Sequence, residues 1–509
     1  MSDQPFQDDD DSQDGSEELP DELSPLTPED IEDAEESDLD EEPDGPHPAA
    51  DDSGDLRDAA FSVESIYAEL RGRAPESQMA PRLEAMRLAM DFLGDPAHSA
   101  PVIQITGTNG KTSTARLVER LLMAHDLRPG RYTSPHLERV NERICVDGEP
   151  VDDATFVRVW DEIRPYLEMV DRQLGEQGEV PLTEFEAMTV LAFAVFADAP
   201  VDIMVLEVGL GGEWDATNVA DAQVSVVTPI DLDHTDMLGD TVEEIAAEKA
   251  GIISQGGFLV SAAQKPSVAE VLLDRARREE AEFRFEGVEF GVTERVPGVG
   301  GQVITIQGLA GRYPEVAFPL FGEHQAENAS LAVAAVEALL GGGEKELSID
   351  LIRTAFEEAT SPGRLETVRT APVVVLDAAH NPHGMRASAA AVRESFDVRQ
   401  LNIVVGILRD KDALGILEVM REQFAESTEF ETRLYVTAST SPRAIPAGEL
   451  GDLALTAGFD DDAVEVHERI DDASVAAISD AATREELDAA VLITGSITVV
   501  GEARVLLGQ

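Results

Sequence analysis

The sequence predicts an α/β protein in which two successive domains each contain a parallel sheet wrapped by helices. From about residue 62, short β-branched runs alternate with amphipathic stretches, as in strands joined by crossover helices. The alternation breaks near residues 359–362, where Thr, Ser, Pro and Gly end a helical pattern, and then restarts. We therefore expect a tail at residues 1–58, a first α/β domain at 59–360 and a second at 361–509.

Each domain contains apolar runs that end in polar loops. In the first domain we expect strands at 101–106, 201–208 and 224–230. We expect helices at 112–125, 185–197 and 241–253, and at 280–320 a Gly-rich β meander or an elaborated sheet edge. In the second domain we expect strands at 372–382, 401–408, 433–440 and 489–496. Two such domains place a crevice between the carboxyl ends of their strands, where parallel sheets bind ligands.

Charge separates the tail from the body. The formal charge is −64, and 24 of the 102 Asp and Glu residues lie in the first 55 positions, before any Lys or Arg. This segment is too acidic and too poor in apolar residues to fold, so it is a solvated extension or a partner-binding arm. The body is also acidic, which disfavours nonspecific nucleic-acid binding. Either salt adaptation or a GC-rich coding bias explains this excess of acidic over basic residues.

The cysteine content and the hydropathy of the sequence exclude several kinds of protein. Cys145 is the only cysteine, which excludes an internal disulfide and a cysteine-built metal site. No apolar run reaches ~18 residues, and the N-terminus has no signal-peptide pattern, so we expect a cytoplasmic protein.

The strongest motif is a loop between a strand and a helix. It is formed by Gly107, Thr108, Asn109, Gly110, Lys111 and Thr112. Its glycines let backbone N–H groups face a phosphate, Lys111 adds a full charge, and Thr112 Oγ1 can ligate Mg²⁺. The spacing differs from the usual phosphate loop, since two residues rather than four separate Gly107 from the Gly-Lys pair. The alternative is an ordinary Gly-rich turn.

Other polar residues lie at or near strand ends. Ser134, Glu207 and His234 are candidate Mg²⁺ ligands, although each is also a common turn, strand-end or capping residue and imidazole is an unusual Mg²⁺ ligand. Lys249 lies in an apolar helical pattern, where a lysine is either extended to the surface or buried and neutralised.

The second domain has its own polar cluster. Arg364, Asp377, His380 and Asn381 lie at or just after strand ends and can hold a polar substrate or close on ATP across the crevice. The alternative is that they are turn formers.

The ordered set of motifs resembles one family, the folylpolyglutamate synthases and dihydrofolate synthases, which are relatives of the Mur peptidoglycan ligases. The resemblance covers most of residues 62–509 and rests on these stretches: TGTNGKTS, TSPHL with ERI, LTEFE, LEVGLGG followed by DATN, DHTDMLG, EKAGII, GEHQAEN, PGRLE, LDAAHNP, GILRDKD and GSITVVGEAR. It implies a Mur-ligase-like fold, in which a P-loop ATPase domain with a central parallel sheet precedes a smaller Rossmann-like glutamate-ligase domain. It also implies an ATP-dependent ligase that adds glutamate to a folate or dihydropteroate carboxylate through an acyl phosphate.

The resemblance implies roles for individual residues. ATP would be bound by the loop 107–112 together with Asn328, Arg364 and Asp377. The family's pattern implies two Mg²⁺ ions, with Thr112, Ser134, Glu207 and His234 as the metal ligands. Lys249 would carry a carbamate formed from CO₂, and Lys111, Lys249 and His380 would be the catalytic residues, with His380 holding glutamate or the intermediate. Substrate contacts would come from Thr183, Glu184, Gly212, Glu213 and Trp214. Relatives commonly have Arg-Leu where this chain has Glu213-Trp214, so pterin recognition there is open.

Two other functions stay open at this stage. One is a Mur-type ligase acting on a UDP-N-acetylmuramoyl peptide, although no N-terminal domain suited to a UDP-sugar is evident. The other is a non-catalytic ATP-binding regulatory protein, against which the intact Lys111, Glu207, His234 and Lys249 argue. For the ligase we expect a monomer with small-molecule substrates and neither nucleic-acid nor membrane partners.

Overall fold

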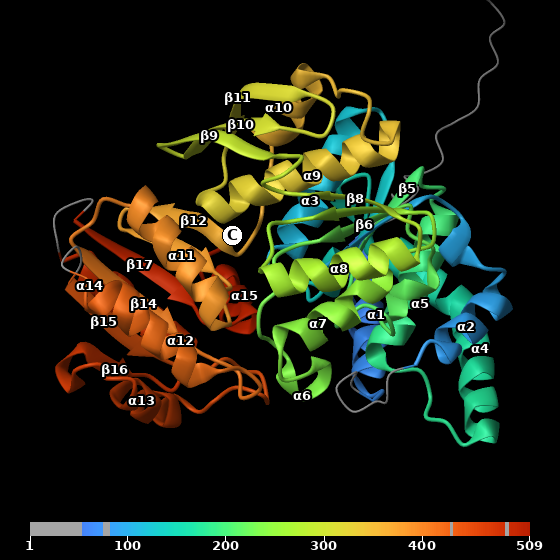
Figure 1. The fold of residues 1–509 in the computed structure, drawn as a ribbon. Helices are drawn as coiled ribbons and strands as arrows, with labels where there is room; N and C mark the ends of the chain where they lie inside the picture. The colour runs from blue at the N-terminus through green and yellow to red at the C-terminus, as the bar shows by residue number, and fades with distance from the viewer. Residues whose placement is uncertain (1–52, 75–81, 428–430, 484–487, 509) are drawn as a thin grey trace, which may run out of the picture. The chain divides into compact units, whose positions relative to one another are not determined.

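The computed structural model describes residues 53–74, 82–427, 431–483 and 488–508 (Figure 1). Most of the predicted acidic tail therefore lies outside the described residues. Helix α1 (Ser53–Arg71) already includes residues 53–58, which the sequence pattern had assigned to the tail. Among the described residues, no helix has the length and apolar character needed to cross a membrane.

The first domain is built on an eight-stranded sheet with the order β4-β3-β2-β5-β1-β6-β7-β8. Strands β2, β5, β1, β6, β7 and β8 run parallel, while β3 and β4 form an antiparallel edge. The strands are β1 (Val102–Thr106), β2 (Pro129–Tyr132), β3 (Ile144–Val146), β4 (Glu149–Pro150), β5 (Ile203–Glu207), β6 (Val224–Val227), β7 (Phe258–Ser261) and β8 (Glu282–Phe285). The three strands predicted for this domain are confirmed as β1, β5 and β6.

Helices cover both faces of this sheet. They are α2 (Glu84–Leu93), α3 (Lys111–Ala124), α4 (Asp153–Gln177), α5 (Glu184–Asp198), α6 (Thr235–Leu238), α7 (Val242–Lys249), α8 (Pro266–Arg278), α9 (Glu323–Gly341) and α10 (Ile349–Glu357). Alternate residues of β5 enter different cores: Met204 and Leu206 pack with α1, α2, α4 and α5, whereas Ile203 and Val205 pack with α3, α9 and α10. Burial on both faces explains why these strands read as continuous apolar runs.

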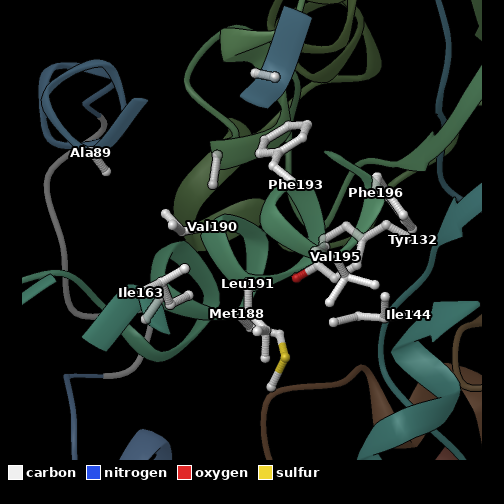
Figure 2. Packing of buried hydrophobic residues seen from close by; sticks show 14 of the residues in the cluster. Ala89, Tyr132, Ile144, Ile163, Met188, Val190, Leu191, Phe193, Val195 and Phe196 are labelled. Atoms are coloured by element: carbon white, nitrogen blue, oxygen red, sulfur yellow. The ribbon is translucent and has the colours of Figure 1, made fainter. Parts of the chain in front are cut away.

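Helix α5 is the centre of the first core. It is apolar nearly all round because it lies between the sheet and other helices. Figure 2 shows Val195 and Phe196 toward Tyr132 and Ile144, and Val190 toward Ile163. Phe196 also covers Gly130 of β2, where an added β-carbon would lie 2.6 Å from the Phe196 ring.

Replacing Phe196 with alanine is expected to lower the free energy of unfolding of the first domain by about 3–5 kcal/mol, through lost burial and the cavity left behind. Trp160 and Trp214, the two tryptophans of the chain, both lie in this domain, so tryptophan fluorescence during urea unfolding reports on it. Met169→Ala, at a position 42% exposed on α4, is the control and should change the midpoint little. Equal shifts for the two variants would contradict the core placement.

The predicted meander at 280–320 contains β8 and a separate antiparallel sheet of order β11-β10-β9. Its strands are β9 (Gly291–Gly298), β10 (Gly301–Gln307) and β11 (Arg312–Phe318). One face of this sheet packs on α9 and α10 through Ile304, Ile306 and Val316. Buried Glu337 of α9 accepts hydrogen bonds from Tyr313 Oη and from three consecutive backbone N–H groups of the loop 309–311.

The second domain has a six-stranded sheet of order β12-β13-β17-β14-β15-β16, parallel except for the edge strand β12. Its strands are β12 (Arg364–Thr370), β13 (Val373–Asp377), β14 (Gln400–Val405), β15 (Glu431–Val436), β16 (Val464–Val466) and β17 (Ala489–Thr494). Its helices are α11 (Pro382–Ser395), α12 (Ala413–Met420), α13 (Ala447–Thr456), α14 (Ile470–Ala481) and α15 (Ile497–Leu506). Helices α11, α12 and α13 share one core with the sheet, and α14 and α15 share the other. The four predicted strands are confirmed as β13, β14, β15 and β17.

Candidate active site

The phosphate loop joins the end of β1 to the start of α3, as the sequence predicts. Gly107 and Gly110 both have positive φ, at 143° and 93°. A β-carbon at Gly107 would lie 1.9 Å from Thr228 Oγ1, and one at Gly110 would lie 2.6 Å from Asn328 Oδ1. Both positions therefore require glycine, because the backbone is in the left-handed region and packs directly against β6 and α9. Asn328, predicted to contact ATP, thus lies beside the loop.

Lys111 is folded back over this loop. Its Nζ donates to the carbonyl oxygens of Gly107 at 3.1 Å and Thr108 at 3.2 Å. Burial lowers the pKa of Lys111, while the carboxylates of Glu207 and Asp233 oppose that shift. A half-buried ammonium group bonded to backbone carbonyls, with two carboxylates nearby, can exchange these contacts for phosphate oxygens when a nucleotide binds.

Glu207 ends β5, next to β1, and is 2% exposed. Thr112 Oγ1 donates to Glu207 Oε1 at 2.9 Å, whereas Oε2 is buried without a hydrogen-bond partner among the described residues. Burial raises the pKa of Glu207, and Lys111, Thr112 and the backbone N–H of Ser134 oppose this. Three of the predicted Mg²⁺ ligands, Thr112, Ser134 and Glu207, therefore come together.

Asp233 joins the first domain to the second. Its Oδ1 accepts a hydrogen bond from Lys411 Nζ at 2.8 Å, and its Oδ2 accepts one from Asn381 Nδ2 at 3.0 Å. His380 Nε2 lies 3.7 Å from the same Oδ2. Burial opposes ionisation of Asp233, but the Lys411 ammonium holds the pKa of Asp233 well below its usual range. One carboxylate thus contacts three side chains of the other domain.

His234, the fourth predicted Mg²⁺ ligand, faces the same lysine. Lys411 Nζ lies 3.0 Å from His234 Nε2. The His234 side chain is 40% exposed, but desolvation by its neighbours, together with the charge of Lys411, lowers the pKa of His234 to about 4, so the ring is neutral at pH 7 and Nε2 accepts the hydrogen bond. His234 is the N-cap residue of the short helix α6, with a positive φ of 50°, and its ring lies within electrostatic reach of Lys111 and Lys249.

Lys249 ends α7 and is buried, at 4% exposure. The sequence left open whether it extends to the surface, and the structure excludes that alternative. Burial and the positive charge of Lys111 lower the pKa of Lys249 to about 7. Gly212 packs on its backbone, since a β-carbon there would lie 2.8 Å from Lys249 O.

The second domain brings Arg364 and Asp377 to the same region. They are paired across β12 and β13; Asp377 is buried at 5% exposure, and Arg364 is half-buried. Burial lowers the pKa of Arg364, while Asp377 and Glu207 oppose it, so Arg364 lies within electrostatic reach of the first domain. Asn381 caps α11 and exchanges hydrogen bonds with Asn109 of the phosphate loop, at 3.2 and 3.0 Å.

Comparisons with known proteins identify the family of this chain. Residues 166–336 match the Mur ligase middle domain, and residues 363–497 match the glutamate ligase domain of Mur ligases. The chain is 44% identical to the dihydrofolate synthase/folylpolyglutamate synthase of Mycobacterium tuberculosis, over 89% of this chain and 95% of that protein. The chain belongs to the folylpolyglutamate synthase and dihydrofolate synthase family of Mur ligases. This confirms the predicted Mur-ligase fold class.

Solved structures of the family align over nearly their whole length. The M. tuberculosis folylpolyglutamate synthase complexed with ADP and AMPPCP aligns with a TM-score of 0.82 at 43% identity, covering 89% of this chain and 99% of that chain. Escherichia coli FolC in complex with DHPP and ADP aligns with a TM-score of 0.74 at 30% identity, covering 88% and 98%.

The described residues fit one Mg²⁺ at the phosphate loop better than they fit an ion at His234. Glu207 Oε2 is a buried carboxylate oxygen with no hydrogen-bond partner in the described part of the chain, the Thr112 hydroxyl binds the other oxygen of the same carboxylate, and oxygen ligands of this kind suit Mg²⁺. His234 Nε2, in contrast, already accepts from Lys411, so Lys411 has to move before His234 can bind an ion. The described residues contain no cluster of three or more His, Cys, Asp or Glu side chains suited to a metal, so a site here depends on hydroxyl groups and water as well.

The predicted substrate residues lie in two separate local structures. Thr183 is buried and caps α5: its Oγ1 accepts from Glu186 N at 3.1 Å. Glu184 Oε1 lies 3.7 Å from Arg143 Nη2. The backbone N–H of Glu213 donates to Glu248 O at 3.1 Å, beside Lys249. The substrate roles of Thr183, Glu184, Gly212, Glu213 and Trp214 remain predictions.

Sequence reasoning missed Asp233 and Lys411. Both lie in motifs that carry the family resemblance, DHTDMLG and GILRDKD, but no role was predicted for either. The available signal was the rarity of lysine, since Lys411 is one of five in the chain. Its partner 178 positions away could not be read from local pattern.

Proposed function

We propose that this protein is an ATP-dependent ligase that adds L-glutamate to folates and to dihydropteroate, the combined activity named for its M. tuberculosis relative. The observation that carries the proposal is a pair of direct contacts with the second domain: Asn109 of the phosphate loop meets Asn381, and Asp233, between β6 and α6, meets Lys411. A ligase needs this arrangement because ATP, the carboxylate and the amine have to meet in one place.

In the proposed reaction the substrate carboxylate attacks the γ-phosphoryl group of ATP, giving an acyl phosphate and ADP. The amine of glutamate then attacks the acyl carbon and loses a proton, and inorganic phosphate leaves the tetrahedral intermediate. Lys111 and the loop N–H groups stabilise charge on the transferring phosphoryl group. Bound Mg²⁺, held by Thr112 and Glu207 with Ser134, would neutralise further phosphate charge.

The second domain completes the proposed site. Arg364 and Asp377 contact ATP from that side, and Asn328 contacts it from α9. His380 donates through Nδ1 to Ala378 O at 2.9 Å, which leaves Nε2 directed toward Asp233. Burial lowers the pKa of His380 to about 4, so a neutral ring is available to accept a hydrogen bond from the ammonium or amine of glutamate.

We further propose that the enzyme acts in the cytoplasm as a monomer on small-molecule substrates. Size-exclusion chromatography with light scattering tests the monomer. Folate polyglutamylation and one-carbon metabolism are the processes that such a ligase serves.

The decisive experiment is to incubate the purified protein with ATP, Mg²⁺ and labelled glutamate, adding dihydropteroate or tetrahydrofolate in separate reactions. We expect both acceptors to gain glutamyl residues, identified by mass, with release of ADP and phosphate. A UDP-N-acetylmuramoyl peptide is run in parallel and should stay unmodified. ATP hydrolysis without a new amide on either pterin, or glutamylation of the muramoyl peptide, would reject the proposal.

A further inference from the structure

The loop after Ser134 is held in one conformation by a single carboxylate. Glu142 accepts hydrogen bonds from the backbone N–H groups of Leu137 at 2.8 Å, Glu138 at 3.0 Å and Arg139 at 2.7 Å. Three charge-assisted bonds to consecutive amides leave this backbone little freedom. The loop is therefore a rigid extension of the site that contains Ser134.

Leu137 is the residue of this loop that contacts the second domain. Its side chain packs against the core formed by β13, α14 and α15, which includes Val499 and Val500. A β-carbon at Gly363 would lie 3.2 Å from Leu137 Cδ1, so Gly363 and Leu137 are in direct contact. Gly363 immediately precedes Arg364, and its carbonyl accepts from Ala378 N at 2.8 Å.

Gly501 makes the closest approach. It lies within helix α15, and a β-carbon there would be 2.2 Å from the carbonyl oxygen of Leu137. A backbone atom held by the Glu142 bonds cannot move aside as a flexible side chain would. Alanine is favoured over glycine by about 1 kcal/mol inside a helix, so a glycine here costs helix stability and permits the contact.

An ion-pair group lies beside this contact. Arg504, one turn further along α15, pairs with Glu138 of the loop and with Glu366 of β12. Glu366 Oε2 also accepts from Gly363 N at 2.8 Å. The same loop is thus tied to the strand that begins with Arg364.

We propose that Leu137 and Gly501 are positioning residues that set the second domain in register with the first, so that Ser134 in one domain and Arg364 and Asp377 in the other address the same nucleotide. The contact connects the loop after Ser134, through the backbone and side chain of Leu137, with Gly501 and with Gly363, the residue before Arg364. This inference rests on the proposed ligase function for its catalytic readout, but the docking itself is measurable without activity.

The test is Gly501→Ala in the full-length chain, with Gly448→Ala as the matched control. Gly448 lies in helix α13, and a β-carbon there meets nothing within 4 Å. Both substitutions raise helix propensity, and only Gly501→Ala obstructs the interdomain contact. For Gly501→Ala we expect kcat for glutamate ligation to fall roughly 100-fold, as expected for a displacement of about 1 Å between reacting groups. We expect Gly448→Ala to keep the wild-type kcat.

Docking is measured separately by energy transfer between dyes on cysteines introduced at exposed Glu176 and Asp452, since Cys145 is buried and does not compete for label. We expect Gly501→Ala to broaden the distance distribution while circular dichroism stays that of the wild type. Leu137→Ala, which removes the packed side chain, should change both readouts in the same direction and replaces Gly501→Ala if that variant does not fold.

Wild-type kcat in Gly501→Ala, or an unchanged distance distribution, would overturn the inference. Loss of kcat in parallel with loss of secondary structure in both variants would also overturn it, because the role would then be structural only. If the wild-type protein ligates no glutamate while Gly501→Ala still broadens the distances, the ligase proposal fails and the docking role stands.

Discussion

Replacing Lys111 with alanine is expected to lower ATP-dependent glutamate ligation by roughly 10³-fold or more, the scale seen when a cationic group is removed from a phosphoryl-transfer site. The physical reason is its position: Nζ already lies among the carbonyl oxygens of Gly107 and Thr108, with Glu207 within electrostatic reach. Removing the ammonium leaves the transferring phosphoryl group without its fixed positive charge. The remaining loop N–H groups still bind nucleotide, so kcat should fall much more than ATP affinity.

Lys265→Ala is the matched control, because Lys265 is exposed and pairs with Asp231 two positions before Asp233. Product formation is followed by mass, nucleotide affinity by a fluorescent ATP analogue, and the fold by circular dichroism. Normal turnover by Lys111→Ala would show that the loop 107–112 does not bind the transferring phosphate. An equal loss in Lys265→Ala would show that the effect is a general change of charge.

Much of the fold could be predicted because its central strands are buried on both faces. Ile203 and Val205 pack on one side of β5 and Met204 and Leu206 on the other, so the whole strand is apolar and its limits are visible in the sequence. The edges could not be predicted in the same way. Strand β4 has two residues and β16 three, which is too short for any periodicity to be seen.

The edge strand β12 was missed for a different reason. It runs antiparallel to β13 and is only partly buried, so polar residues alternate irregularly along it, and two register shifts interrupt the pairing. The Ser-Pro-Gly sequence just before β12 predicts a loop, and the mixed polar pattern of β12 itself is also typical of a loop. The domain boundary itself remains a prediction, although α10 ends at Glu357 and β12 starts at Arg364, on either side of the expected break.

Some residues of the candidate site could be predicted from the sequence and others could not. Residues that follow a recognisable local pattern, such as the glycines of the phosphate loop, could be assigned because their backbone geometry requires them. The contacts of Asp233 with Lys411 and of Leu137 with Gly501 join residues that lie far apart in the sequence, and they form only when the two domains dock. No periodicity within either domain encodes that docking.

Replacing Lys249 with alanine is the second change with a large expected effect, a loss of nearly all ligation. Its reason is the proposed carbamate, in which the neutral amine attacks CO₂, a C–N bond forms and a proton is released. Only the neutral amine can react, and burial with the nearby Lys111 lowers the pKa of Lys249 to about 7, against about 10.4 for an ordinary lysine. At neutral pH a large fraction of Lys249 is therefore neutral.

The sign of the pH effect follows from that shift. The neutral fraction increases as pH rises through about 7 and is lost below it, so carbamate occupancy should fall between pH 7 and pH 5. Carbon-13 NMR with labelled bicarbonate measures that occupancy directly, separately from the pH dependence of turnover. The Lys345→Ala variant, which changes an exposed lysine, is the control and should keep the signal.

Chemical rescue distinguishes the carbamate from a structural role. In Lys249→Ala the removed side chain leaves a space at the end of α7, and formate or acetate can supply the carboxylate oxygens that the carbamate would have provided. We expect part of the ligation activity to return with either anion, and no return with chloride at the same ionic strength. Because a buried lysine that only filled space would be replaced best by an apolar residue, full activity in Lys249→Met, or a fully active wild-type enzyme with no carbamate signal, would reject the modification.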